Sequence, residues 1–173
     1  ALLVCCSLIL FSKKHVVVPA ILILIFVIPS AQRILILSID FSFLRIAILV
    51  ALLRAQLKGD QNQIRHSKPD KLILIWMVWS VIAYGLLNQS FGSVATRAGY
   101  MVDAVGAYFV GRIYITSWED IRRITKFIGY ASIPVAAVFL IERSTGRNMF
   151  SVFGGINEYT LVRDGKLRCQ GPF

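Results

Sequence analysis

Long runs of apolar residues, separated by short polar stretches, dominate the pattern of this chain. A helix needs about 20 mostly apolar residues to cross the hydrocarbon core of a bilayer, and the runs approach that length. We therefore predict six membrane spans, the first of them truncated: residues 1–12, 16–32, 34–53, 72–96, 98–118 and 127–141. The predicted fold class is all-α, a polytopic transmembrane helical bundle over residues 1–141.

The third predicted span has a second interpretation. It contains Asp40, and burying a lone carboxylate in lipid is costly. Asp40 and Arg45 are five residues apart, so they do not form the i,i+4 pair that would shelter both charges. Residues 34–41 would then lie in the outer interface, and the third helix would start near Phe41.

The distribution of Lys and Arg predicts the orientation of the spans, because short cytoplasmic loops retain positive charge. Basic residues follow the first, third and fifth spans: Lys13, Lys14, Arg54, Lys58, Arg65, Lys68, Lys71, Arg122, Arg123 and Lys126. These loops are expected to be cytoplasmic. Residues 142–173 are then expected to be the start of a periplasmic loop, which the chain truncates.

Composition agrees with a membrane protein. The chain is 57% hydrophobic and 16% charged, whereas soluble domains carry about 25% charged residues, so the composition argues against a water-soluble enzyme. The lipid bilayer is the expected partner. In such a chain the excess of 19 Lys and Arg over 9 Asp and Glu bears first on orientation, and we expect no nucleic-acid partner. The three cysteines and two histidines do not form a metal-ligand pattern, so neither a metal nor a cofactor is expected.

The fifth predicted span carries two charges. Asp103 shares a helix face with Ala107 and Gly111, and small residues let another helix approach, so we expect Asp103 to point into the bundle. Arg112 is nine residues further on, about 180° around the helix, so the two cannot pair with each other. Arg112 either contributes to a site or extends toward the cytoplasmic interface.

The segment 142–173 departs from the charge rule. It holds five basic residues on the predicted periplasmic side: Arg143, Arg147, Arg163, Lys166 and Arg168. An anionic ligand would explain them. The alternative is that a large loop is translocated regardless of its charge.

A β-hairpin is predicted inside this loop, because Asp164-Gly165 is a two-residue turn signal between two short apolar and basic runs. The register follows from the turn: Leu161 opposite Arg168, Val162 opposite Leu167, and Arg163 opposite Lys166. Three cations then share one face. Like charges opposite each other are destabilising, so acidic neighbours or a bound polyanion such as a pyrophosphate would complete the arrangement.

Four segments resemble bacterial O-antigen ligases and O-antigen polymerases: the run Trp-Glu-Asp-Ile-Arg-Arg from Trp118, residues 141–150, the pair Gly154-Gly155, and above all residues 162–173. The resemblance covers most of the chain, loosely in the spans and more specifically from Trp118 onward. It implies the N-terminal part of a multi-pass enzyme of the bacterial inner membrane. Such a glycosyltransferase, of the GT-C type, takes a glycan from undecaprenyl pyrophosphate to lipid A core or to a growing polysaccharide, without a metal or a nucleotide sugar.

The resemblance also implies site residues. Arg163 and Arg168 match the family's loop motif, with Lys166 between them, and Arg112 occupies a family-like arginine position; these are the expected substrate-binding residues. The family uses a periplasmic histidine, whereas both histidines here fall at predicted cytoplasmic ends. The general base is therefore expected beyond Phe173. Glu142 is the candidate substitute, or else a simple helix-end carboxylate.

Two other classes of function remain open on the sequence. In a multi-pass transporter, Asp103 and Arg112 would line a pathway through the membrane. In a non-catalytic membrane assembly protein, they would serve packing alone.

Overall fold

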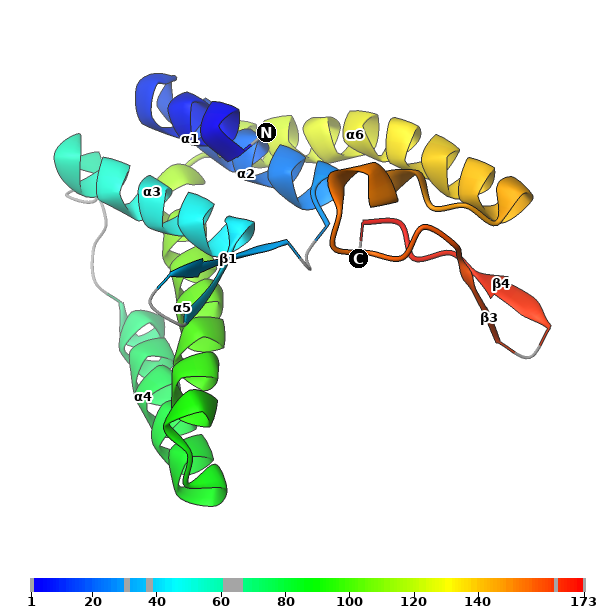
Figure 1. Ribbon diagram of the computed structural model, residues 1–173. Coiled ribbons are helices and arrows are strands. Elements are labelled where there is room, and N and C mark those ends of the chain that lie inside the picture. Colours follow the sequence, from blue (N-terminus) through cyan, green and yellow to red (C-terminus); the bar gives the residue numbers. More distant parts are fainter. Residues whose placement is uncertain (1, 30–31, 37–38, 61–66, 164, 173) are drawn as a thin grey trace.

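The computed structural model describes residues 2–29, 32–36, 39–60, 67–163 and 165–172. Within these ranges the chain is mostly helical (Figure 1). The α-helices are α1 (Leu2–Phe11), α2 (Val17–Val27), α3 (Phe43–Leu57), α4 (Lys68–Asn88), α5 (Phe91–Tyr114) and α6 (Trp118–Thr145). Two short 3-10 helices, η1 (Lys14–Val16) and η3 (Met149–Phe153), precede α2 and follow α6. Two small antiparallel hairpins complete the fold: β1 (Arg33–Ile36) with β2 (Ile39–Ser42), and β3 (Leu161–Arg163) with β4 (Lys166–Arg168).

The helices form two arms that run in different directions. Helices α4 and α5 pair side by side and project away from the rest, while α6 runs across that direction and contacts α2 (Figure 1). The buried core lies where α1, α2, α3 and the last turns of α5 meet; its most enclosed side chains are Ile9, Val17, Ile48, Ala51 and Tyr114. Tyr114 also donates its hydroxyl to the Ala51 carbonyl at 2.9 Å, which joins α5 to α3.

Two helices, α4 and α6, are long and apolar enough to cross a membrane. Almost none of the apolar stretch in either helix is covered by the rest of the described chain. Large apolar side chains such as Trp79 and Leu87 on α4, and Ile133 and Leu140 on α6, are exposed. Soluble proteins rarely expose apolar surface on this scale. The two helices therefore indicate association with a lipid bilayer.

The predicted bundle of six spans is not confirmed. Helices α1, α2 and α3 have 10, 11 and 15 residues, which is short of a full crossing. Helix α5 is long enough, with 24 residues, but it carries charges at Arg97, Asp103 and Arg112. The arms are also not parallel, as a simple bundle would require (Figure 1). The mostly helical class is correct, and the sequence predicted one of the two hairpins.

Two predicted span boundaries were wrong for local reasons. Residues 34–53 do not form one helix, because the β1–β2 hairpin precedes α3 and Ser42 caps the helix by accepting a hydrogen bond from the Arg45 N–H at 3.1 Å. The helix start near Phe41 was the better interpretation; the Asp40 side chain lies outside the described part. The fourth span ends at Asn88 instead of residue 96, because Gln89 adopts a left-handed conformation (φ 46°) before α5 begins.

Glycines on α5 set how closely α3 approaches. A Cβ on Gly106 would lie 2.5 Å from Ile48 Cγ2, and one on Gly99 would lie 2.7 Å from the Arg45 guanidinium nitrogens. The predicted small-residue face was wrong, because Ala107 is exposed and a Cβ on Gly111 would meet nothing within 4 Å. Gly99 and Gly106 lie four residues before and three after Asp103, so they share its face. The sequence placed Asp103 correctly and chose the wrong neighbours.

Gly106→Ala is expected to destabilise the helix arrangement by about 1–3 kcal/mol, because the added methyl must displace Ile48. Gly111→Ala is the matched control: it makes no such contact, and alanine favours helix by roughly 0.5–1 kcal/mol, so it should be neutral or stabilising. Thermal unfolding in detergent measures both. Adding Ile48→Ala to Gly106→Ala should recover part of the loss, and equal melting of the two glycine variants would contradict the packing described here.

Candidate functional site

A bidentate ion pair joins α3 to α5. The Arg45 guanidinium donates from Nε to Asp103 Oδ1 and from Nη2 to Asp103 Oδ2, both at 2.8 Å. Arg45 is 9% exposed, and its side chain lies against Gly99, where no Cβ intervenes. Asp103 thus points toward a neighbouring helix, as predicted, and its partner is Arg45. The pair gives Asp103 a structural role in holding the two helices together.

A second polar cluster ties the start of α4 to the end of α5. Asp70 is 2% exposed and accepts hydrogen bonds from the Tyr108 hydroxyl at 2.7 Å, the Ser67 N–H at 2.7 Å and Arg112 Nη2 at 3.2 Å. Sequence reasoning gave Asp70 no role. The signal was its place three residues after Ser67, where an acidic side chain can accept from the backbone of the helix cap.

Arg112 is therefore not part of the basic hairpin. It lies just before α6 begins, and the hairpin follows the other end of α6, which at 28 residues is about 42 Å long (Figure 1). The structure brings Lys166 and Arg168 together on β4 and places Arg112 beside Asp70 instead.

Glu142, in the last turn of α6, is fully buried. Its carboxylate accepts hydrogen bonds from Thr160 Oγ1 at 3.0 Å, the Gln170 N–H at 2.9 Å and the Gly171 N–H at 3.0 Å. These donors lie far along the chain, so Glu142 fastens both sides of the hairpin segment to the helix end. This is a structural role, and none of the described contacts supports the use of Glu142 as a general base.

Asn148 makes a second attachment that sequence reasoning missed. It is 1% exposed, donates from Nδ2 to the Gly171 carbonyl at 2.9 Å and accepts from the Phe150 N–H at 2.9 Å. Gly171 has a φ of 58° and packs so closely that a Cβ would lie 2.2 Å from Phe139 Cζ on α6. Residues 146–172 therefore fold back onto the end of α6.

The β3–β4 hairpin has the predicted register: Leu161 opposite Arg168, Val162 opposite Leu167, and Arg163 opposite Lys166. Gly165 in the turn has a φ of 73°, a left-handed conformation that suits a two-residue hairpin turn. Lys166 and Arg168 are exposed, and within the described residues no acidic side chain forms an ion pair with either. The side chain of Arg163 and all of Asp164 lie outside the described part.

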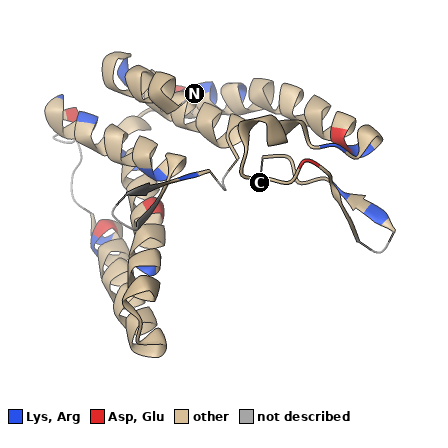
Figure 2. Cartoon of the chain, in the orientation of Figure 1, with Lys and Arg blue, Asp and Glu red and all other residues tan. Residues whose placement is uncertain are grey.

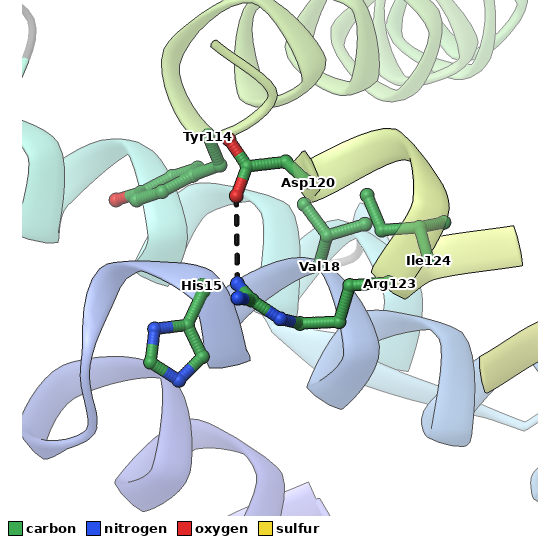
Figure 3. Close-up of a pocket in the computed structure, with 6 residues that line it drawn as sticks. All are labelled: His15, Val18, Tyr114, Asp120, Arg123 and Ile124. Atoms are coloured by element: carbon green, nitrogen blue, oxygen red, sulfur yellow. Dashed lines mark ion pairs between the residues drawn. The ribbon is translucent and has the colours of Figure 1, made fainter. Parts of the chain in front are cut away.

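The middle of α6 carries no Lys, Arg, Asp or Glu, whereas charged residues occur toward both of its ends (Figure 2). At the start of α6, Asp120 pairs with Arg123 at 3.5 Å beside His15, and these side chains line a crevice too narrow for a water molecule (Figure 3). Nearby, Arg54 stacks over the Tyr114 ring at 5.5 Å and donates to the Ser12 carbonyl at 3.0 Å. His15, Arg54 and Arg123, which come from three predicted cytoplasmic loops, thus all lie near Tyr114. His66 lies outside the described residues.

Comparison with known proteins adds no assignment: no family model, no curated protein and no solved structure matches this chain. Over the described residues, no three His, Cys, Asp or Glu side chains are grouped as a metal site. The exposed cationic hairpin offers chemistry to an anionic ligand, because accessible Lys and Arg side chains suit an anion.

Proposed function

We propose that the chain is part of a bacterial inner-membrane glycan ligase or polymerase. The full protein would pass through the membrane several times and transfer a glycan from undecaprenyl pyrophosphate to lipid A core or to a growing polysaccharide. The observation that supports this most is the exposed hairpin, whose Lys166 and Arg168 stand without acidic partners among the described residues. Its sequence is also the segment with the strongest family resemblance.

The chemistry of such a transfer needs positive charge at the leaving group. As the glycan departs, negative charge grows on the lipid pyrophosphate, and fixed cations offset it at no cost of rearrangement during the reaction. The hairpin is held to the C-terminal end of α6 by Glu142 and Asn148. In the proposed orientation this end faces the periplasm, at the level where the pyrophosphate of a membrane-borne lipid would lie. Glu142 therefore acts as a positioning residue, and the general base is expected elsewhere in the intact protein.

The transporter alternative gains no support from these contacts. Asp103 and Arg112 would have to line a pathway, yet each is engaged in an ion pair with a neighbouring helix, Asp103 with Arg45 and Arg112 with Asp70. The pairs explain why both charges occur in α5 without a transported ion.

Arg168→Ala and Arg163→Ala are each expected to weaken donor binding and glycan transfer by about 10–100-fold. The reason is the loss of charged hydrogen bonds worth about 1.5–3 kcal/mol each. Lysine at either position should restore little of the donor binding or glycan transfer, because it lacks the planar guanidinium group that binds a phosphate with two parallel hydrogen bonds. Transfer and donor binding are measured in membranes from cells expressing the intact protein, with expression level recorded beside them.

Arg143→Ala is the matched control for charge. Arg143 is an exposed cation at the same end of α6 and outside the hairpin, so its loss should leave transfer unchanged. Wild-type transfer by both hairpin variants, with equal donor binding, would refute the proposed site.

A further inference from the structure

We propose that the β3–β4 hairpin is a membrane-surface element. One face contacts the acyl chains near the headgroups of the outer leaflet, and the opposite face presents cations to lipid phosphates. The ligand is the bilayer surface itself, so the inference goes beyond the proposed transfer reaction and requires no glycan donor.

The register separates apolar and cationic side chains. Neighbouring residues in a strand point to opposite faces, and directly opposite residues share a face. Val162 and Leu167 are therefore on one face, while Lys166 and Arg168 are on the other with Leu161. Val162 is 66% exposed and Leu167 is 43% exposed, so the described chain leaves the apolar face largely uncovered.

The hairpin lies where a bilayer surface is expected. It is fastened to the end of α6, one of the two helices able to cross a membrane, and Leu140 and Ile141 in the preceding turn are exposed. Leu167 Cδ2 lies 3.9 Å from the Cβ position of Gly146, the residue that caps α6. Leu167, on the apolar face, thus lies close to the C-terminal end of α6.

Charged side chains and unpaired backbone groups limit how deeply the hairpin can enter the bilayer. Lys and Arg can keep their charged ends among phosphates while an apolar face enters the interface, and Tyr159, 70% exposed just before β3, is of a type enriched at that level. Deeper insertion is unfavourable, since the outer edges of a two-stranded hairpin carry backbone groups without partners. An isolated two-stranded hairpin is also only marginally stable in water, so contact of its apolar face with lipid would stabilise it.

Site-directed spin labelling of the full chain in proteoliposomes tests this. Single cysteines replace Val162, Leu167, Lys166 or Arg168 in a background with serine at the native cysteines, Cys5, Cys6 and Cys169. Leu140→Cys serves as the lipid-exposed reference and Asn157→Cys as the water-exposed reference. Collision rates of the nitroxide with oxygen, which concentrates in lipid, and with a nickel chelate, which stays in water, report the environment of each label.

The expected result is an alternation along β4. Labels at 162 and 167 should resemble the label at 140, and labels at 166 and 168 should resemble the label at 157. Adding Val162→Asp should move the label at 167 into water. Equal nickel access at all four positions would overturn the proposal, and so would protection of 162 and 167 from both reagents, since a protein surface would then cover them. Glycan transfer is not measured, so failure here leaves the proposed function standing.

Discussion

Asp103→Ala should lower the free energy of unfolding by about 3–5 kcal/mol, because it removes the carboxylate that accepts two hydrogen bonds from the mostly buried Arg45 guanidinium. The Arg45 guanidinium that remains is 9% exposed and is held against Gly99 by the packing of α3 on α5. The measurement is reversible unfolding in mixed micelles, followed by the fluorescence of the tryptophans.

A double variant separates the charge effect from a packing effect. Arg45→Met with Asp103→Leu removes both charges and keeps most of the volume, and such replacements are often neutral or stabilising. The double variant should therefore be more stable than Asp103→Ala. Glu119→Ala, at an exposed acidic residue of α6, is the control and should change stability by less than about 0.5 kcal/mol. A double variant as unstable as the single one would show that the charges are not the source of the loss.

Glu142→Ala is expected to release the hairpin segment from the end of α6. The substitution leaves Thr160 Oγ1 and the N–H groups of Gln170 and Gly171 without their acceptor, at about 1–3 kcal/mol each. The helix itself should survive, since its backbone bonds are unaffected. Hydrogen exchange at Gln170 and Gly171 should rise strongly, and proteolysis within residues 154–158 should accelerate.

A neighbouring acidic residue provides the comparison. Glu158 forms an ion pair with Arg147 that is exposed to solvent, so Glu158→Ala should cost at most about 1 kcal/mol and leave exchange at Gly171 unchanged. Glu142→Gln should be intermediate, because an amide keeps only one accepting oxygen. Normal exchange at Gly171 in Glu142→Ala would contradict the anchoring role.

Local signals predicted the hairpin register. The turn pair Asp164-Gly165 and a period of two fix which residues face each other, so Val162 opposite Leu167 follows without knowledge of the rest of the fold. The sequence also came close to the start of α3, which was expected near Phe41 and follows Ser42. Both signals are local: Ser42 caps the helix, and burying the Asp40 carboxylate in lipid would be costly.

Features that depend on distant parts of the chain were not predictable. Small residues occur on more than one face of α5, and only the position of Ile48 on α3 decides that Gly106, and not Gly111, is the contact. The donors to Glu142 come from 18 to 29 residues further along, and no periodic pattern links such positions. The separation of Arg112 from the hairpin likewise depends on the length of α6, a distance that resemblance alone does not give.

The attachment of Gly171 to Glu142 also bears on how this segment can vary in length and sequence. Asn148, near the start of the segment, bonds to Gly171, near its end, and Gly171 bonds to Glu142, so the segment forms a loop closed at the end of α6. Lengthening a flexible loop costs only about 0.6 kcal/mol per doubling. Insertions and substitutions near the turn should therefore have little effect on α6.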